Sequence, residues 1–315
     1  MYNSCIKDWK RQETANFSRV TTKWFFLTQV VTWCHMWTVC AVENHNLRRA
    51  SFIAIPYTVL IIYCIMIRFR YGSETKFTEM VHNLDFHDAY QRYSNNPADP
   101  LLPKPLNPAG FRVLLRNSNS FETRDVVIFI KTISENYSLR KQIRETWGNA
   151  KCYAKHGFTA QIVFVVGVSA PDVAQQSEKQ QRLNSEHLLY HDIIQFDFVD
   201  AYRNNTYKLM SILKYATEAC SKSRFVLIFD EDFLVSPKNV VQTLAKVTQT
   251  HYPYYIGGHI MEGAGPIRNW ADKWFMTTIQ YPYVDLPRYP TGGSVFMSMD
   301  VAKLLAFGLR LFYFM

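Results

Sequence analysis

The sequence lacks the residue patterns that form several common kinds of site. None of its six cysteines belongs to a CxxC pair or to a Cys/His zinc spacing. A glycine-rich phosphate loop is absent as well, which argues against a nucleotidyl or phosphoryl transferase of that type. Only Cys152 and Cys220 lie in the later part of the chain. They are either a disulfide formed in an oxidising compartment or two separate thiols.

Acidic residues are also scarce, and the excess of positive charge is concentrated near the N-terminus. The 315 residues carry a formal net charge of +9. Residues 1–70 hold nine Lys or Arg and three Asp or Glu, which accounts for +6 of that charge. Basic residues beside apolar segments suit anionic lipid headgroups better than a nucleic-acid groove. We therefore predict no nucleic-acid partner, and a hydrophobic share of 48% excludes a disordered chain.

The apolar segment at residues 51–67 has no charged side chain and is flanked by Arg48, Arg49, Arg68 and Arg70. As a helix it would be about 25 Å long, near the lower limit for crossing a bilayer. We predict a transmembrane anchor there; a buried core helix is the alternative. Residues 1–50 would form a cytoplasmic tail, in which residues 24–42 are a weaker second apolar segment.

The region after the anchor changes character twice. Residues 68–123 are polar and irregular, with five prolines between positions 96 and 108, which favours an extended stem. Residues 124–315 alternate short apolar runs with helical patterns, which predicts strands at 126–130, 162–166 and 225–229 and helices at 175–189 and 209–220. This order predicts an α/β domain of Rossmann type, with a mostly parallel sheet flanked by helices.

Three consecutive acids, Asp230-Glu231-Asp232, follow the predicted strand at 225–229. Ligands bind at the carboxyl ends of strands in open α/β sheets. Two carboxylates one residue apart point the same way and can reach one hard divalent cation, which in turn can neutralise a diphosphate. The alternative is an acidic turn exposed to solvent. The position directly after a buried strand favours a metal site formed by Asp230 and Asp232.

Four segments in the same order resemble the beta-1,3-galactosyltransferase and N-acetylglucosaminyltransferase family, glycosyltransferase family 31. The first carries an Arg-x-x-x-Arg-x-Thr-Trp signature, the second an Asp-Phe-x-Asp-x-Tyr-x-Asn-x-Thr-x-Lys block, the third the acidic triplet and the fourth the acceptor-side region. In this sequence they are Arg140–Trp147, Asp197–Lys208, Asp230–Asp232 and Pro266–Asp300.

The resemblance implies a GT-A fold and an inverting transfer that uses Mn²⁺ or another divalent cation. The donor would be a UDP-sugar, and galactose or an N-acetylhexosamine would pass in β-1,3 linkage to a glycan on a glycoprotein or glycolipid. It implies metal ligation by Asp232, with Asp230 at the metal or the ribose. Guanidinium and ammonium groups suit phosphates, so the candidate donor contacts are Arg140, Arg144 and Lys208, and those on the acceptor side are Gly292 and Gly293. Trp147 is more typical of a core residue than of a ligand stack.

The sequence departs from the family pattern at two places. Glu231 replaces the usual middle Asp, which should be tolerable because that side chain points away from its neighbours' ligand side. The family's catalytic base lies in an acidic-Asp-Val motif, and none is found before Met315. We therefore expect the base beyond Met315, an incomplete domain with no partner for the strand around 294–298, and a chain too short for useful transfer. The alternative function is a catalytically inactive membrane protein that binds a nucleotide sugar or a partner.

The resemblance also implies a place in the cell. Proteins of this family work in the Golgi as single-pass type II membrane proteins with a luminal catalytic domain. Three segments fit the N-glycosylation acceptor pattern. The one at Asn16 lies in the predicted cytoplasmic tail and should stay unmodified, and the other two are at Asn136 and Asn204. We expect both to be modified if the domain is luminal.

Overall fold

The computed structural model describes residues 59–63, 86–105, 110–116, 123–169 and 173–311. These ranges leave out the predicted cytoplasmic tail, with its apolar segment at 24–42, and most of the predicted anchor at 51–67. Residues 59–63, within that anchor, are helical. Within the described ranges, no helix combines the length and the hydropathy needed to cross a bilayer. The chain divides into two compact units, and Phe86–Glu262 with Arg288–Met315 form the unit that holds the sheet.

A seven-stranded sheet forms the centre of this unit, in the order β1-β4-β3-β2-β5-β7-β6. Strands β4, β3, β2 and β5 are parallel neighbours, whereas β1 and β7 run antiparallel to the strands beside them. The strands are β1 Val113–Leu115, β2 Val126–Lys131, β3 Ala160–Val168, β4 Ile193–Val199, β5 Phe225–Asp230, β6 Ile256–Met261 and β7 Tyr289–Ser298.

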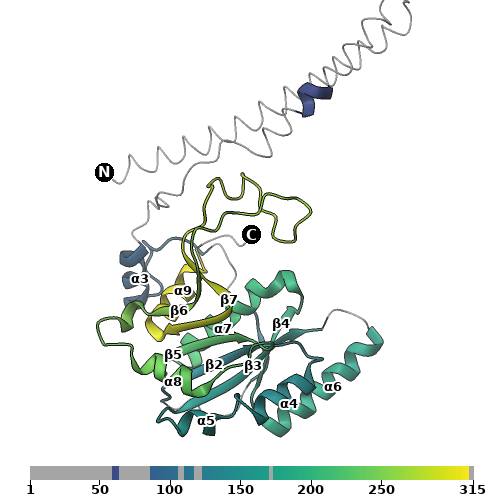
Figure 1. Ribbon diagram of the computed structural model, residues 1–315, viewed down its shortest axis with the longest axis vertical. Helices are drawn as coiled ribbons and strands as arrows, with labels where there is room; N and C mark the ends of the chain where they lie inside the picture. Colours follow the sequence, from purple (N-terminus) through teal and green to yellow (C-terminus); the bar gives the residue numbers. More distant parts are fainter. Residues whose placement is uncertain (1–58, 64–85, 106–109, 117–122, 170–172, 312–315) are drawn as a thin grey trace, which may run out of the picture. The chain divides into compact units, whose positions relative to one another are not determined.

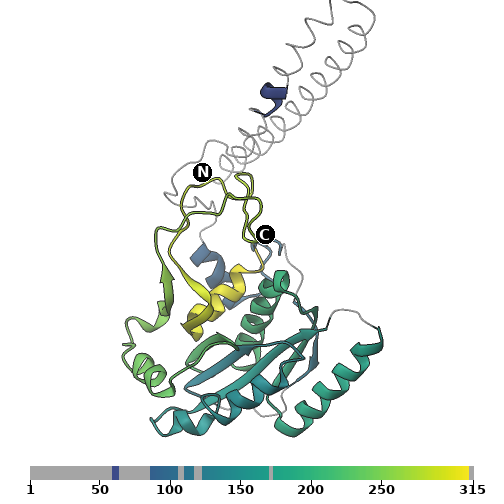
Figure 2. The ribbon, with the colours of Figure 1, turned by 45° about the vertical axis from the view of Figure 1, so that its right-hand side comes forward.

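Helices cover both faces of the sheet (Figures 1 and 2). Alternate residues of each central strand face opposite cores: Val127 packs in the core of α7 and α9, and Ile128 packs in the core of α4, α5, α6 and α8. Because both faces are buried, the strands are apolar at nearly every position. The α-helices are α3 Phe86–Asn95, α4 Tyr137–Glu145, α5 Ala150–Ala154, α6 Val173–Tyr190, α7 Asn205–Ala219, α8 Pro237–Ala245 and α9 Met299–Gly308, with 3-10 turns at Tyr202–Asn204 and Tyr252–Tyr254.

The predicted elements are confirmed. The strands expected at 126–130, 162–166 and 225–229 are β2, β3 and β5, and the helices expected at 175–189 and 209–220 are α6 and α7. Trp147 is 5% exposed and meets Phe229 edge-on, with 5.8 Å between ring centroids, so it belongs to the core. Cys152 and Cys220 are separate thiols. Burial raises the pKa of Cys220 to about 12.

Strand β7 contradicts the expectation that the segment around 294–298 has no partner. It pairs with β5 on one side, Phe229 opposite Ser294, and with β6 on the other, Gly257 opposite Phe296. The sequence does not reveal β6, because its segment contains two consecutive glycines, has no buried residue and lacks the continuous apolar run that marks the central strands.

Two parts of the predicted stem, 68–123, belong to the folded unit. Strand β1 pairs with β4 at the sheet edge. Helix α3 packs on α9 through aromatic rings, with Phe86 and Tyr93 centred 5.5 and 5.0 Å from Phe307. An ion pair of 2.8 Å between Asp88 and Arg92 supports this helix on its exposed side. The prolines that predicted an extended spacer follow α3 instead of preceding the whole domain.

Residues 263–287, which belong to the other unit, form an excursion between β6 and β7 with its own hydrogen bonds. The Arg268 guanidinium donates to the carbonyl oxygens of Met276, Tyr281 and Tyr283, at 2.8, 2.7 and 3.0 Å. One arginine thus ties together three points of a segment that has almost no regular secondary structure.

Candidate active site

The candidate site lies where the order of the strands reverses. From β2 the chain continues outward to β3 and β4, and then returns to place β5 on the other side of β2. In such sheets, a crevice opens beyond the carboxyl ends of the two strands at the reversal. Here Lys131 at the end of β2 stands opposite Asp230 at the end of β5. The acidic triplet therefore occupies this reversal point, as its position after a buried strand predicted.

Asp230 is held by an ion pair next to the two predicted acceptor-side glycines. Its Oδ1 lies 2.7 Å from Lys131 Nζ. Lys131 Nζ also donates to the carbonyl oxygen of Gly292 at 2.9 Å. A Cβ atom at Gly293 would lie 3.2 Å from Asp230 Oδ2 and only 2.6 Å from the Phe233 ring. The structure thus brings together Asp230, Gly292 and Gly293, and adds Lys131, which sequence reasoning missed.

Asp232 is exposed, in contrast with Asp230, whose side chain is 37% exposed and paired. Among the described residues no three His, Cys, Asp or Glu side chains form a ready metal cage. Two neighbouring carboxylates nevertheless suit a cation of the Mn²⁺ or Mg²⁺ type, which commonly takes one or two protein carboxylates and completes its shell with phosphate and water oxygens. The donor set fits such a partial site, with Asp232 as the freer ligand.

Glu231 makes its side-chain hydrogen bonds to the loop between β2 and α4. Its Oε1 accepts a hydrogen bond of 2.5 Å from Asn136 Nδ2, and its Oε2 accepts a short one from Thr132 Oγ1. Burial raises the pKa of the Glu231 carboxyl, although these two hydrogen bonds act in the opposite direction. Glu231 therefore joins the end of β5 to the loop between β2 and α4.

Arg140 is fully buried and binds only protein groups. Its guanidinium donates to Glu186 at 2.9 and 2.6 Å, to Thr132 Oγ1 at 3.2 Å and to Ser134 O at 3.0 Å, and makes a short bond to the Ile133 carbonyl. These five bonds use all the N–H groups of an arginine. A direct contact of Arg140 with the donor would require some of them to break.

Arg144 and Lys208, the other two candidate donor contacts, also have protein partners. Arg144 donates to both oxygens of Asp192, at 2.7 and 2.8 Å. Lys208 Nζ lies 2.8 Å from Asp200 Oδ1 and donates to the carbonyl oxygen of Thr132 at 2.7 Å. Burial lowers the pKa of Lys208, and Asp200 acts against that shift. Lys208 thus contacts the site only indirectly, by its hydrogen bond to the backbone of Thr132.

The two predicted glycosylation sites use their amide nitrogens within the fold. Asn136 Nδ2 is the donor to Glu231, and Asn204 Nδ2 donates to the carbonyl oxygen of Val199 at 2.7 Å. A glycan on either nitrogen would have to form in competition with that bond. The Asn204 bond is exposed, whereas the Asn136 bond is partly buried beside the acidic triplet.

A cleft of about 740 Å³ adjoins the loop between β2 and α4. Helix α6 forms its other wall, and the cleft is lined by Ser134, Glu135, Tyr137, Glu178, Lys179, Gln181, Arg182, Leu183, Ser185, Glu186 and Leu189. Ser134 and Glu186 also belong to the Arg140 network. The acidic end of β5 and this cleft are therefore connected through the same loop.

The family model described as galactosyltransferase matches residues 138–309, which include the acidic triplet and the two glycines but begin after Lys131 and Asn136. The chain belongs to the galactosyltransferase family. The match takes in the whole of β3 to β7 and most of α4, whereas β1 and β2 precede it.

Curated relatives of the domain carry glycosyltransferase names. Beta-1,3-galactosyltransferase 1 of Mus musculus and of Homo sapiens is 32% identical over 204 residues, which cover 64% of this chain and 60% of theirs. Lactosylceramide 1,3-N-acetyl-beta-D-glucosaminyltransferase of Rattus norvegicus is 32% identical over 191 residues, or 60% of this chain and 50% of its own. The chain thus spans about half to three fifths of these relatives.

Proposed function

We propose that this chain is a metal-dependent inverting hexosyltransferase of GT-A type. It would move galactose or an N-acetylhexosamine from a UDP-sugar to a sugar hydroxyl in β-1,3 linkage. The observation that carries the proposal is the exposed Asp232 carboxylate, next to the Lys131–Asp230 pair at the strand-order reversal of a galactosyltransferase-family domain. The names of the relatives, which cover both galactose and N-acetylglucosamine transfer, support this range of donors.

The residues would share the work as follows. Asp232 would hold Mn²⁺, with Asp230 assisting at the metal or at the ribose, and the cation when bound supplies positive charge to the leaving diphosphate. Lys131 keeps Asp230 in place, and the absence of a side chain at Gly293 leaves room beside that carboxylate. The 740 Å³ cleft offers space for the nucleotide next to the same loop.

The predicted donor contacts of Arg140, Arg144 and Lys208 would then be indirect. Their charged groups bind Glu186, Asp192 and Asp200, and two of them hold the loop at the end of β2. We propose that they shape the donor side of the site through this loop.

The apolar, arginine-flanked segment at 51–67 supports a membrane anchor, and the family supports the Golgi lumen as the place of the domain. N-glycans on Asn204 in animal cells would support the luminal orientation. A protein that carried none would favour the opposite side of the membrane.

The test is titration calorimetry of UDP with and without Mn²⁺, followed by transfer assays from UDP-galactose and UDP-N-acetylglucosamine to simple sugar acceptors. We expect the wild type to bind UDP in a Mn²⁺-dependent way and Asp232→Ala to lose that dependence, because a direct carboxylate ligand is removed. Glu218→Gln, an exposed change on α7, serves as the charge-matched control. Unchanged Mn²⁺-linked affinity in Asp232→Ala would refute the metal assignment.

A further inference from the structure

One side chain fastens the acidic end of β5 to the loop after β2. Both carboxylate oxygens of Glu231 are used: Thr132 Oγ1 donates to one, and Asn136 Nδ2 donates to the other at 2.5 Å. The backbone helps, since Glu231 N donates to the carbonyl oxygen of Lys131 at 3.2 Å. Asn136 occupies the N-cap position of α4 but makes no capping bond with its side chain. Its amide is committed to Glu231 instead.

Thr132, one of the two partners of Glu231, is itself held by residues that form buried ion pairs. Thr132 is 2% exposed; its hydroxyl accepts from Arg140 Nη1 at 3.2 Å, and its carbonyl accepts from Lys208 Nζ at 2.7 Å. Both cations are themselves paired, with Glu186 and Asp200. Thr132 therefore cannot shift without disturbing two buried charge pairs, which makes it a fixed point for Glu231.

The length of the glutamate side chain matters for this contact. An aspartate at this position would retract the carboxylate by roughly one C–C bond, about 1.5 Å. The donor–acceptor distances from Asn136 and Thr132 would then become too long for a hydrogen bond. A glutamine keeps the reach but not the charge.

We propose that Glu231, through Thr132 and Asn136, is the positioning residue that fixes the Asp230–Asp232 turn in the geometry needed to receive a cation-bound diphosphate. The proposal rests on the proposed function for the identity of the ligand. It assigns Glu231 no contact with metal or substrate. Fixing the turn beforehand removes an ordering cost from binding. The same fastening should protect the backbone amides of the turn against hydrogen exchange even when no ligand is bound.

The first test compares Asn136→Ala with Ser138→Ala. Both changes destroy the same glycosylation acceptor pattern, but only Asn136 touches Glu231, and Ser138 is exposed on α4. The difference between them therefore cannot come from a lost glycan. We expect Asn136→Ala to weaken Mn²⁺-linked UDP binding about tenfold, with UDP binding in EDTA unchanged, and Ser138→Ala to match the wild type.

The second test separates reach from charge at position 231. Glu231→Gln keeps the reach and Glu231→Asp keeps the charge, so the proposal requires the Gln variant to retain more Mn²⁺-linked UDP affinity than the Asp variant. The reverse order would overturn it, because it would show that Glu231 acts as a charge. Equal affinity of Asn136→Ala and Ser138→Ala would overturn it as well.

Hydrogen exchange of the segment after β5 gives a readout that needs no ligand. We expect the amides of residues 231–233 to exchange faster in Asn136→Ala and Glu231→Asp than in Ser138→Ala. Wild-type protein that fails to bind UDP with Mn²⁺ would refute the proposed function, and these exchange rates would still decide the positioning role. Identical exchange in all three variants would refute the positioning role alone.

Discussion

Gly292 and Gly293 are neighbours on β7, but their surroundings differ. A Cβ atom added at Gly292 meets nothing within 4 Å, whereas one added at Gly293 would lie 2.6 and 2.8 Å from two atoms of the Phe233 ring. Phe233 is 39% exposed, so its ring can move away. The added methyl group itself would lie 3.2 Å from Asp230 Oδ2, in the space beside that carboxylate. A side chain at Gly293 therefore changes the site more than it changes the stability of the strand.

We predict that Gly293→Ala weakens Mn²⁺-linked UDP binding by about tenfold while the melting temperature stays within a few degrees of the wild type. The expected loss corresponds to about 1.4 kcal/mol. Gly292→Ala, one residue away in open space, should change neither quantity. Calorimetry and thermal unfolding of the two variants make the comparison. Equal binding by both would mean that Phe233 can relax without affecting the acids.

Sequence reasoning found some residues of the site and missed their partners. Asp230 and Asp232 could be predicted because they follow a continuous apolar strand, a pattern that is local in the chain. Glu186, by contrast, lies 46 residues from Arg140 on a helix of polar composition, and no spacing links them. The charge of Arg140 suited a phosphate, but its environment depends on the packing of α4 against α6, which only the fold defines.

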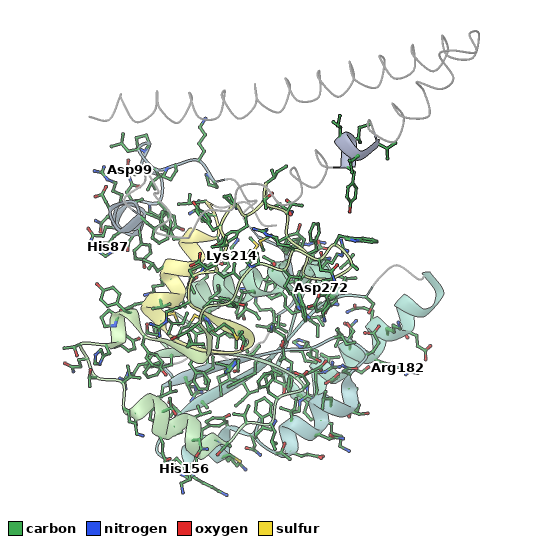
Figure 3. All side chains as sticks on the ribbon, turned by 45° about the horizontal axis from the view of Figure 1, so that its top comes forward. His87, Asp99, His156, Arg182, Lys214 and Asp272 are labelled. Atoms are coloured by element: carbon green, nitrogen blue, oxygen red, sulfur yellow. The ribbon has the colours of Figure 1, made fainter. Side chains whose placement is uncertain are left out.

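Charged side chains of α4 and α6 form ion pairs in two very different settings. Arg140 and Glu186 meet with side-chain exposures of 0% and 2%, whereas Arg182 and Glu178, both on α6, have exposures of 78% and 65%. Figure 3 labels Arg182 on the outer side of α6. Removing one partner of a buried pair leaves an uncompensated charge in the interior, whereas water replaces the partner at the surface.

We predict that Arg140→Met lowers the free energy of unfolding by about 3–5 kcal/mol, and that Arg182→Met lowers it by less than about 0.5 kcal/mol. Urea denaturation of both variants measures the difference. Arg144 Nη1 lies 2.8 Å from Glu186 Oε1 and remains as a partner of that carboxylate, so the loss in Arg140→Met should come mainly from the hydrogen bonds that Arg140 makes to the loop after β2. Similar midpoints for the two single variants would show that the buried pair contributes little.

The central strands and the two long helices were predictable, and the C-terminal edge of the sheet was not. Strands β2, β3 and β5 are apolar on both faces because helices cover both, so their pattern stands out in the sequence. Strand β6 has the exposure pattern of an edge strand and carries Gly257 and Gly258, which weaken any strand pattern. Strands β6 and β7 pair with each other although the excursion at 263–287 separates them in the chain, so no local pattern predicts the pairing.

At the scale of the whole molecule, the excursion at 263–287 begins and ends at one place on the sheet. Met261 of β6 pairs with Tyr289 of β7, and the next residues outward, Glu262 and Arg288, form an ion pair. The two ends are thus held together by the sheet itself. Inside the excursion, Arg268 gathers three carbonyl oxygens. The segment is therefore tied at its base and within itself.

We predict that replacing residues 263–287 by a short Gly/Ser turn leaves the sheet folded and keeps Mn²⁺-linked UDP binding. Shortening a loop changes its closure cost by only about 0.6 kcal/mol per halving, so stability should change little. Arg268→Ala, which loosens the excursion without removing it, should spare UDP binding as well. Loss of UDP binding in the shortened chain would contradict this prediction.

The closed base of this excursion bears on how much its sequence can change. Since its two ends leave from paired positions on β6 and β7, a change in its length or sequence does not alter the register of the strands that carry the acidic triplet. The excursion can then vary in length and sequence while the strands keep their pairing, much as variable loops do on a constant scaffold. Exchanging only this segment with that of a relative is the natural way to build a chimaera that keeps the sheet intact.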